Sequence, residues 1–125
     1  MRTNIKEFEM YFTVTENDFA TFDQKVVHQV YSTFSIARDA EWTGRQLFLA
    51  NKEENEEAVG THVNIRHKAP AFLNDNVKIE VRFESYQHDI LTCSFTASVE
   101  DRVIADGTTG QKVMTITKIN RLFKK

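Results

Sequence analysis

The sequence has few of the residues that cross-link or punctuate a chain, and each scarcity excludes a class of protein. Cys93 is the only cysteine among 125 residues, so no intrachain disulfide can form and no oxidising compartment is implied. No apolar run approaches the roughly 20 residues that span a bilayer, and the first residues lack the apolar stretch of a signal peptide. We therefore expect a soluble, cytoplasmic protein that does not enter a membrane.

Neither sign of charge predominates in the chain. The net charge is -2, and acidic and basic residues are spread along the chain without the basic stripe of a nucleic-acid binder. The acidic segment 53–57 is expected to be a solvated loop, and the basic end 121–125 to fray. With 41% hydrophobic residues, the chain can build one compact core, and we expect a single domain over residues 1–125.

The first half of the chain predicts a strand and a long helix. Residues 8–14 alternate between apolar and polar side chains, which indicates a strand, and a less regular region follows from Phe19. Residues 32–51 contain no proline and are rich in good helix formers, which predicts a helix of four to five turns. Ser32, Thr33 or Ser35 is expected to cap it. Gly44 suits this helix only if another element packs closely there.

The second half predicts four strands joined by short turns, which make neighbouring strands antiparallel. The helix is the only large element able to cover their apolar faces. We therefore predict an α+β fold, an antiparallel β-sheet wrapped around one long central α-helix, with open edges that favour a homodimer or a dimer of dimers. The predicted strands are one from Gly60 that Pro70 closes, 77–83, 91–99 and 103–119, the last with a bulge or kink at Gly107 and Gly110.

Glu41 is the first candidate for chemistry, because it falls on the predicted apolar stripe of the helix. A buried carboxylate costs free energy unless it is paired or used. An ion pair with Arg38 or Arg45 and a functional carboxylate are both open. The other members of the stripe are Phe34, Ala37, Gly44 and Phe48.

His67 and Thr33 are the other candidates. His67 has the strand parity of Val63 and Ile65, so it is expected to face inward, either as a hydrogen-bonded core residue or as a catalyst. Thr33 is either a capping hydroxyl or a reactive one. On one helix Thr33 and Glu41 would be separated by a rise of roughly 12 Å and a rotation of about 80°. They can therefore act together only if Thr33 leaves the helix, a substrate spans the gap, or a second subunit contributes.

Other reactive chemistry has little support. Cys93 lies mid-strand on an apolar face and is expected to be packing. The histidines and carboxylates show no metal-ligand spacing, and no phosphate-binding or nucleophile-elbow glycine motif occurs.

Taken together, Thr33, Glu41, Gly60 and His67 resemble the hotdog thioesterases related to fluoroacetyl-CoA thioesterase. That family carries a threonine, a glutamate eight residues later, a glycine at the start of the next strand and a histidine seven residues after the glycine. All four positions match. The resemblance covers roughly residues 26–119, and it departs from the family where Thr109 and Gln111 replace a histidine and an arginine.

The resemblance implies an acyl-CoA thioesterase that releases a free acid and coenzyme A. Thr33 would attack the carbonyl or position water, His67 would be the general base, Glu41 would orient the histidine or the water, and Gly60 would bind substrate through its backbone. Coenzyme A is part of the substrate, and no metal or separate cofactor is expected. The alternatives are a non-catalytic acyl-CoA sensor or carrier, and an acyl-CoA hydratase of the same fold.

Overall fold

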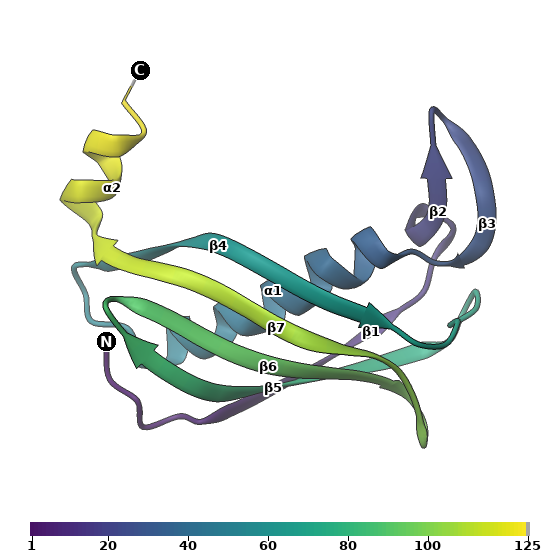
Figure 1. Cartoon of the computed structure of the whole chain (residues 1–125), viewed down its shortest axis with the longest axis horizontal. Coiled ribbons are helices and arrows are strands. Elements are labelled where there is room, and N and C mark those ends of the chain that lie inside the picture. Colours follow the sequence, from purple (N-terminus) through teal and green to yellow (C-terminus); the bar gives the residue numbers. More distant parts are fainter. Residues whose placement is uncertain (125) are drawn as a thin grey trace.

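Five strands form one antiparallel sheet along which a long helix runs, as the computed structural model of residues 1–124 shows (Figure 1). The strands are hydrogen-bonded in the order β1-β5-β6-β7-β4, so β1 and β4 are the edges. The predicted α+β architecture is confirmed. The elements are β1 (Glu7–Thr13), a 3-10 helix (Glu16–Asp18), β2 (Phe19–Phe22), β3 (Lys25–Tyr31), α1 (Thr33–Asn51), β4 (Glu56–His67), β5 (Asn76–Gln87), β6 (Ile90–Val99), β7 (Arg102–Thr115) and α2 (Ile116–Leu122).

The core lies between α1 and one face of this sheet. In β5 the alternate residues Val77, Ile79 and Val81 are fully buried, which is the period-two pattern of a strand with one covered face. Cys93 on β6 is buried in the same layer, as predicted. Burial raises the pKa of its thiol to about 12, so it stays protonated and serves only packing.

The helix begins where the sequence places it. Ser32 is the cap, and its hydroxyl accepts a hydrogen bond of 3.1 Å from the N–H of Ser35. The predicted buried stripe is only partly right. Gly44 and Phe48 are buried, but Phe34 is 47% exposed and Glu41 is exposed. The helix has apolar residues on two faces, and the sequence pattern does not tell which of the two the sheet covers.

Residues 19–31, which have no regular pattern in the sequence, form the β2–β3 hairpin. At its turn Asp23 and Gln24 have φ angles of 52° and 64°. Two consecutive positive φ angles are typical of a type I′ turn, whose usual sequence signal is Asn-Gly or Asp-Gly. Neither dipeptide occurs at this turn, so the hairpin could not be predicted from the sequence.

The last strand ends earlier than predicted. The chain leaves β7 at Thr115, whose hydroxyl caps α2 by accepting a hydrogen bond of 3.1 Å from the N–H of Lys118. Ile119 of α2 is buried, so the expectation of a strand up to residue 119 is wrong. The expectation of a frayed end is wrong for Arg121 and Leu122, which belong to α2. Lys125 lies outside the described residues. Neither described helix has the length and apolar composition needed to cross a membrane.

Strand β4 starts at Glu56, not at Gly60. Glu56 binds the N-terminal ammonium at 2.8 Å and Glu57 binds Arg45, so the acidic segment is only in part a solvated loop. The pairing of β4 with β7 shifts between Gly60 and His62, which leaves the residue between them without a partner in this ladder. This extra residue is therefore in β4, opposite Gly110, whereas the extra residue of β7 is Ile104, in the pairing with β6, and not one of the glycines that were expected to kink the strand.

Candidate active site

Thr33 and His67 are in direct contact. Thr33 is the first residue of α1 and His67 is the last residue of β4, and these two ends meet. The hydroxyl oxygen of Thr33 lies 2.9 Å from Nδ1 of His67. When Nδ1 carries no proton, the hydroxyl donates to it, which is the arrangement in which an imidazole can take the proton of an attacking oxygen.

This pair is open to solvent. Thr33 is not the helix cap, because Ser32 has that role. The His67 ring faces α1, as its strand parity predicts, but it is exposed and is not a core residue. The reason is that β4 is an edge strand whose last residue lies opposite only the first turn of α1, where no further element covers it. The hydroxyl and the ring are therefore both accessible to a ligand.

Glu41 forms neither of the ion pairs, with Arg38 or with Arg45, that would have given it a purely structural role. Arg38 is bound by two aspartates, one of them its neighbour Asp39 at 2.9 Å. Arg45 binds Glu57 at 2.9 Å. Burial raises the pKa of Glu57, but the N–H of the next residue and the Arg45 guanidinium outweigh it and hold that pKa below its usual value. Within residues 1–124, Glu41 has no ion-pair partner, and its carboxylate remains available.

The carboxylate of Glu41 rests against the backbone of Gly60. A Cβ atom added at Gly60 would lie 3.0 Å from Oε2 of Glu41. Any side chain at position 60 would therefore displace the carboxylate. The next residue, Thr61, is the one left unpaired by the irregularity in β4, so the backbone here is free of regular ladder bonds on its β7 side.

The four candidate residues thus form two pairs along one line between α1 and β4. Thr33 with His67 lies at the start of the helix, and Glu41 with Gly60 lies two turns further on. The helical spacing of Thr33 and Glu41 amounts to roughly 12 Å along the axis.

A groove of about 640 Å³ opens between α1, β4 and β7 at the second pair. Glu41 and Gly60 line it together with Trp42, Thr109 and Gln111. Trp42 is 50% exposed, which is unusual for so large an apolar side chain, and it gives the groove an apolar wall. Such a concave surface, apolar with a few convergent polar groups, is typical of a small-molecule site.

The floor of the groove explains Gly44. A Cβ atom at Gly44 would lie 3.0 Å from Oγ1 of Thr109, so the predicted close packing at this glycine is confirmed. That hydroxyl is buried, and it has no hydrogen-bond partner within residues 1–124. An unsatisfied buried hydroxyl costs about 1–3 kcal/mol, and such groups need a functional or structural reason. The sequence marked Thr109 only as a departure from a family pattern.

The described part of the chain, residues 1–124, contains no group of three or more histidine, cysteine, aspartate or glutamate side chains placed to hold a metal ion. The reactive groups that the structure brings to this site are a hydroxyl, an imidazole and a carboxylate. Together they can activate an oxygen nucleophile, move a proton and orient water.

Comparisons with known proteins identify the family and the fold. A family model described as fluoroacetyl-CoA-specific thioesterase, FlK, matches residues 14–117. A hypothetical protein of Thermus thermophilus, described as a thioesterase superfamily member, has a TM-score of 0.90 at 29% identity, over 94% of this chain and 87% of that chain. No match was found among curated proteins.

Two more distant structures share the fold. A mutant of the fluoroacetyl-CoA-specific thioesterase FlK, in complex with fluoroacetate and CoA, has a TM-score of 0.83 at 19% identity, covering 92% of this chain and 97% of that one. A hot-dog-like protein from Thermanaerovibrio acidaminovorans has a TM-score of 0.83 at 19% identity, covering 95% and 91%. The helix and five-stranded sheet therefore form a hotdog fold.

Proposed function

The chain belongs to the family of fluoroacetyl-CoA-specific thioesterases, and we propose that it hydrolyses a small acyl-CoA thioester to the free acid and coenzyme A. The reactive residues in this proposal are Thr33, Glu41 and His67. The observation that carries it is the contact of 2.9 Å between the Thr33 hydroxyl and the His67 ring. A pair of this kind activates an oxygen nucleophile, which thioester cleavage needs and mere ligand binding does not.

In the first form of the mechanism, Thr33 is the nucleophile. Its oxygen attacks the thioester carbonyl while its proton passes to Nδ1 of His67. The tetrahedral intermediate then expels the thiolate of coenzyme A, which takes that proton from His67. Water, deprotonated by the same ring, finally attacks the Thr33 ester. The acid leaves, and His67 returns the proton to the Thr33 oxygen. In the second form Thr33 stays unacylated and holds the water that His67 deprotonates.

Glu41 and Gly60 act on the same carbonyl group as the first pair. The unpaired carboxylate of Glu41 orients the attacking water or the His67 ring. Close approach is possible at Gly60 because it has no side chain, and its backbone N–H stabilises the oxyanion that forms on the carbonyl oxygen. Because the carbon that Thr33 attacks and the oxygen that Gly60 receives belong to one carbonyl group, the proposal requires both pairs to reach that group at once.

The protein works as a homodimer. Strand β4 is an edge of the sheet, and its 12 residues pair only with β7. An edge this long attracts a second strand unless it is blocked, and a second copy of β4 can pair with it about a two-fold axis. Because β4 carries Gly60 and His67, this contact places both pairs of the site beside the subunit boundary.

The test is release of free thiol from a panel of short, branched and aromatic acyl-CoAs. We expect at least one to be cleaved, and cleavage to fall at least about 100-fold in His67→Ala, the scale of general-base loss. His62→Ala, on the same strand outside the pair, is the matched control. An ester on Thr33, detected by mass spectrometry after rapid quenching, would select the first form of the mechanism.

Three outcomes would contradict the proposal in whole or in part. Tight binding of an acyl-CoA without thiol release would favour a sensor or carrier. Hydration of an unsaturated acyl-CoA without thiol release would favour a hydratase. Thiol release that persists in both His67→Ala and Glu41→Ala would support a thioesterase but show that these two residues are not its reactive residues.

A further inference from the structure

Two arms extend past the β4 edge of the sheet, one at each end (Figure 1). The hairpin arm consists of residues 19–31, which form β2 and β3. The helical arm consists of residues 116–124, which include α2. Between the arms, β4 offers the open strand edge on which the proposed dimer rests.

Both arms expose apolar side chains of the size that normally lies in a core. On the hairpin arm Phe22 is 60% exposed, and Val26 and Val27 are each 52% exposed. On the helical arm Leu122 is 59% and Phe123 is 70% exposed. Adjacent exposed apolar groups like these mark a surface that another element covers.

The arms of one chain cannot cover each other. The hairpin arm leads into α1 at Thr33, which touches His67 at the last residue of β4. The helical arm follows Thr115, which pairs with Glu56 at the first residue of β4. The 12 residues of β4 separate these two points by roughly 40 Å at the usual rise of an extended strand.

A two-fold axis brings unlike arms together. When two β4 strands pair antiparallel, the first residue of one lies beside the last residue of the other. We propose that the helical arm of each subunit packs against the hairpin arm of its partner, so that every dimer contains two such contacts. This inference rests on the proposed dimer and adds to it the segment that closes each site.

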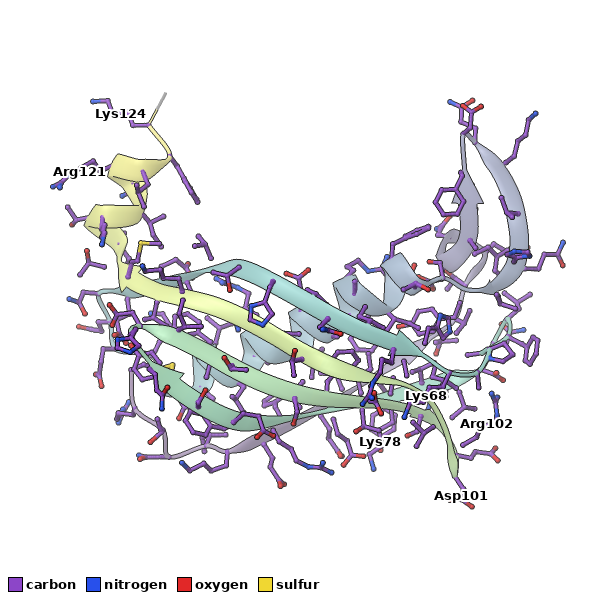
Figure 2. All side chains as sticks on the ribbon, viewed as in Figure 1. Lys68, Lys78, Asp101, Arg102, Arg121 and Lys124 are labelled. Atoms are coloured by element: carbon purple, nitrogen blue, oxygen red, sulfur yellow. The ribbon has the colours of Figure 1, made fainter. Side chains whose placement is uncertain are left out.

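The surface of the helical arm suits this partner. A second groove, of about 390 Å³, lies beside α2 and is lined by Ile116 and Phe123, with Arg45 of α1 at its other side. The charged side chains of the helical arm are all cationic, and Figure 2 shows Arg121 and Lys124 at its outer end. The tip of the hairpin arm carries one charge of each sign, Asp23 and Lys25. The exposed apolar side chains of the two arms therefore favour this contact, and charge does not oppose it.

The contact would also complete the active site. Phe22 of the hairpin arm packs edge-to-face on Phe34, with ring centroids 5.9 Å apart. Phe34 directly follows Thr33, so the hairpin arm adjoins the Thr33–His67 pair. A helical arm laid on that hairpin covers the pair with side chains of the partner subunit. It thereby limits the length of the acyl group and excludes water from the thioester.

Cross-linking tests the contact directly. Val26→Cys and Leu122→Cys each add one accessible thiol, since Cys93 is 1% exposed. In the double variant, a short bis-maleimide should give a covalent dimer in high yield. The matched control joins Leu122→Cys to Tyr11→Cys, because Tyr11 is 56% exposed and lies on β1, the edge of the sheet opposite β4. The control should give little covalent dimer.

The outcomes distinguish the contact between the arms from the proposed dimer and from the proposed thioesterase activity. A dimer by light scattering with no cross-link between positions 26 and 122 would overturn the arm contact and keep the dimer. A monomer without the cross-link would overturn both. Cross-linked dimers that release no thiol would keep the contact and overturn the thioesterase.

A charge substitution gives a second readout. Leu122→Asp should raise the dimer dissociation constant at least about tenfold, because it would bury a carboxylate in an apolar contact. It should also raise KM for the acyl-CoA more than it lowers kcat, since the reactive groups stay in place. Thr117→Asp adds the same charge to α2 and should change neither value, and equal effects of the two variants would overturn the contact.

Discussion

The two faces of α1 differ in what they do with polar groups. On the face against the sheet, every polar side chain has a partner: the hydroxyl of Thr43 donates to a backbone carbonyl at 2.7 Å, and Asn51 binds both the N–H and the C=O of Ile5. On the groove face, Glu41 has no ion-pair partner among residues 1–124, and Trp42 is half-exposed.

The difference separates stability from function on a single helix. Polar groups in a core are satisfied because an unsatisfied one costs about 1–3 kcal/mol. A reactive group has to stay available to a ligand, so it lies where solvent can replace the missing partner. Substitutions on the sheet face should therefore change stability, and substitutions on the groove face should change activity.

The largest expected effect comes from two substitutions on opposite faces of α1. Glu41→Ala should lower thiol release about 100-fold and change the free energy of unfolding by less than about 0.5 kcal/mol, because it removes an exposed group without a partner. Asn51→Ala should lower stability by about 1–3 kcal/mol, because it leaves the backbone of Ile5 unsatisfied, with kcat unchanged. Urea unfolding and steady-state kinetics on both variants measure this. If both lose activity and stability together, the two faces are not separate.

A smaller effect is expected at Gly44, where the two faces adjoin. Alanine gains about 1 kcal/mol in helix propensity, but its Cβ would lie 3.0 Å from the Thr109 hydroxyl, and overpacking costs about 1–3 kcal/mol. Gly44→Ala should therefore destabilise the protein. In a Thr109→Ala background residue 109 keeps only its Cβ, which lies 4.0 Å from the added Cβ at position 44. Gly44→Ala should then become stabilising. Additive effects in urea unfolding would show that the hydroxyl is not the obstacle.

The smallest effect concerns pH. Burial raises the pKa of Asp18, but hydrogen bonds from the Thr15 backbone and from Arg38 at 2.8 Å outweigh it and hold that pKa below its usual value. The folded state therefore binds this proton less readily than the unfolded state. The stability that Asp18 contributes is present above the unfolded carboxyl pKa, near 4, and is lost as pH falls through the lower folded value.

Asp18→Asn should accordingly be less stable than the native protein at neutral pH, by about 1 kcal/mol, with the gap closing below about pH 4. Thermal unfolding between pH 7 and pH 2.5 measures it. Asp101→Asn is the matched control, because Asp101 is exposed at the β6–β7 turn (Figure 2). A gap for Asp18→Asn that is constant with pH would contradict the assignment.

The helix, its cap and the antiparallel sheet could be read from the sequence because each depends on neighbours in the chain. Alternation in residues 77–83 and 91–99 reports one covered face, and Ser32 caps a helix through a group three residues away. The β2–β3 hairpin was not predicted because its turn lacks the usual Asn-Gly or Asp-Gly signal. Helix α2 was not predicted because its seven residues are too few to show a helical pattern. The candidate site could be named only by resemblance, since each residue taken singly had an ordinary structural explanation.

By itself the sequence determined where the helix and most of the strands form, and that a threonine, a glutamate and a histidine stand at a recognisable spacing. Only the tertiary structure decided which face of α1 is covered, because the helix is apolar on both. It also decided that Thr33 meets His67 and that Glu41 lies on Gly60. These contacts join residues 34 and 19 positions apart, and their distances depend on how β4 folds back along the helix, which no local pattern encodes.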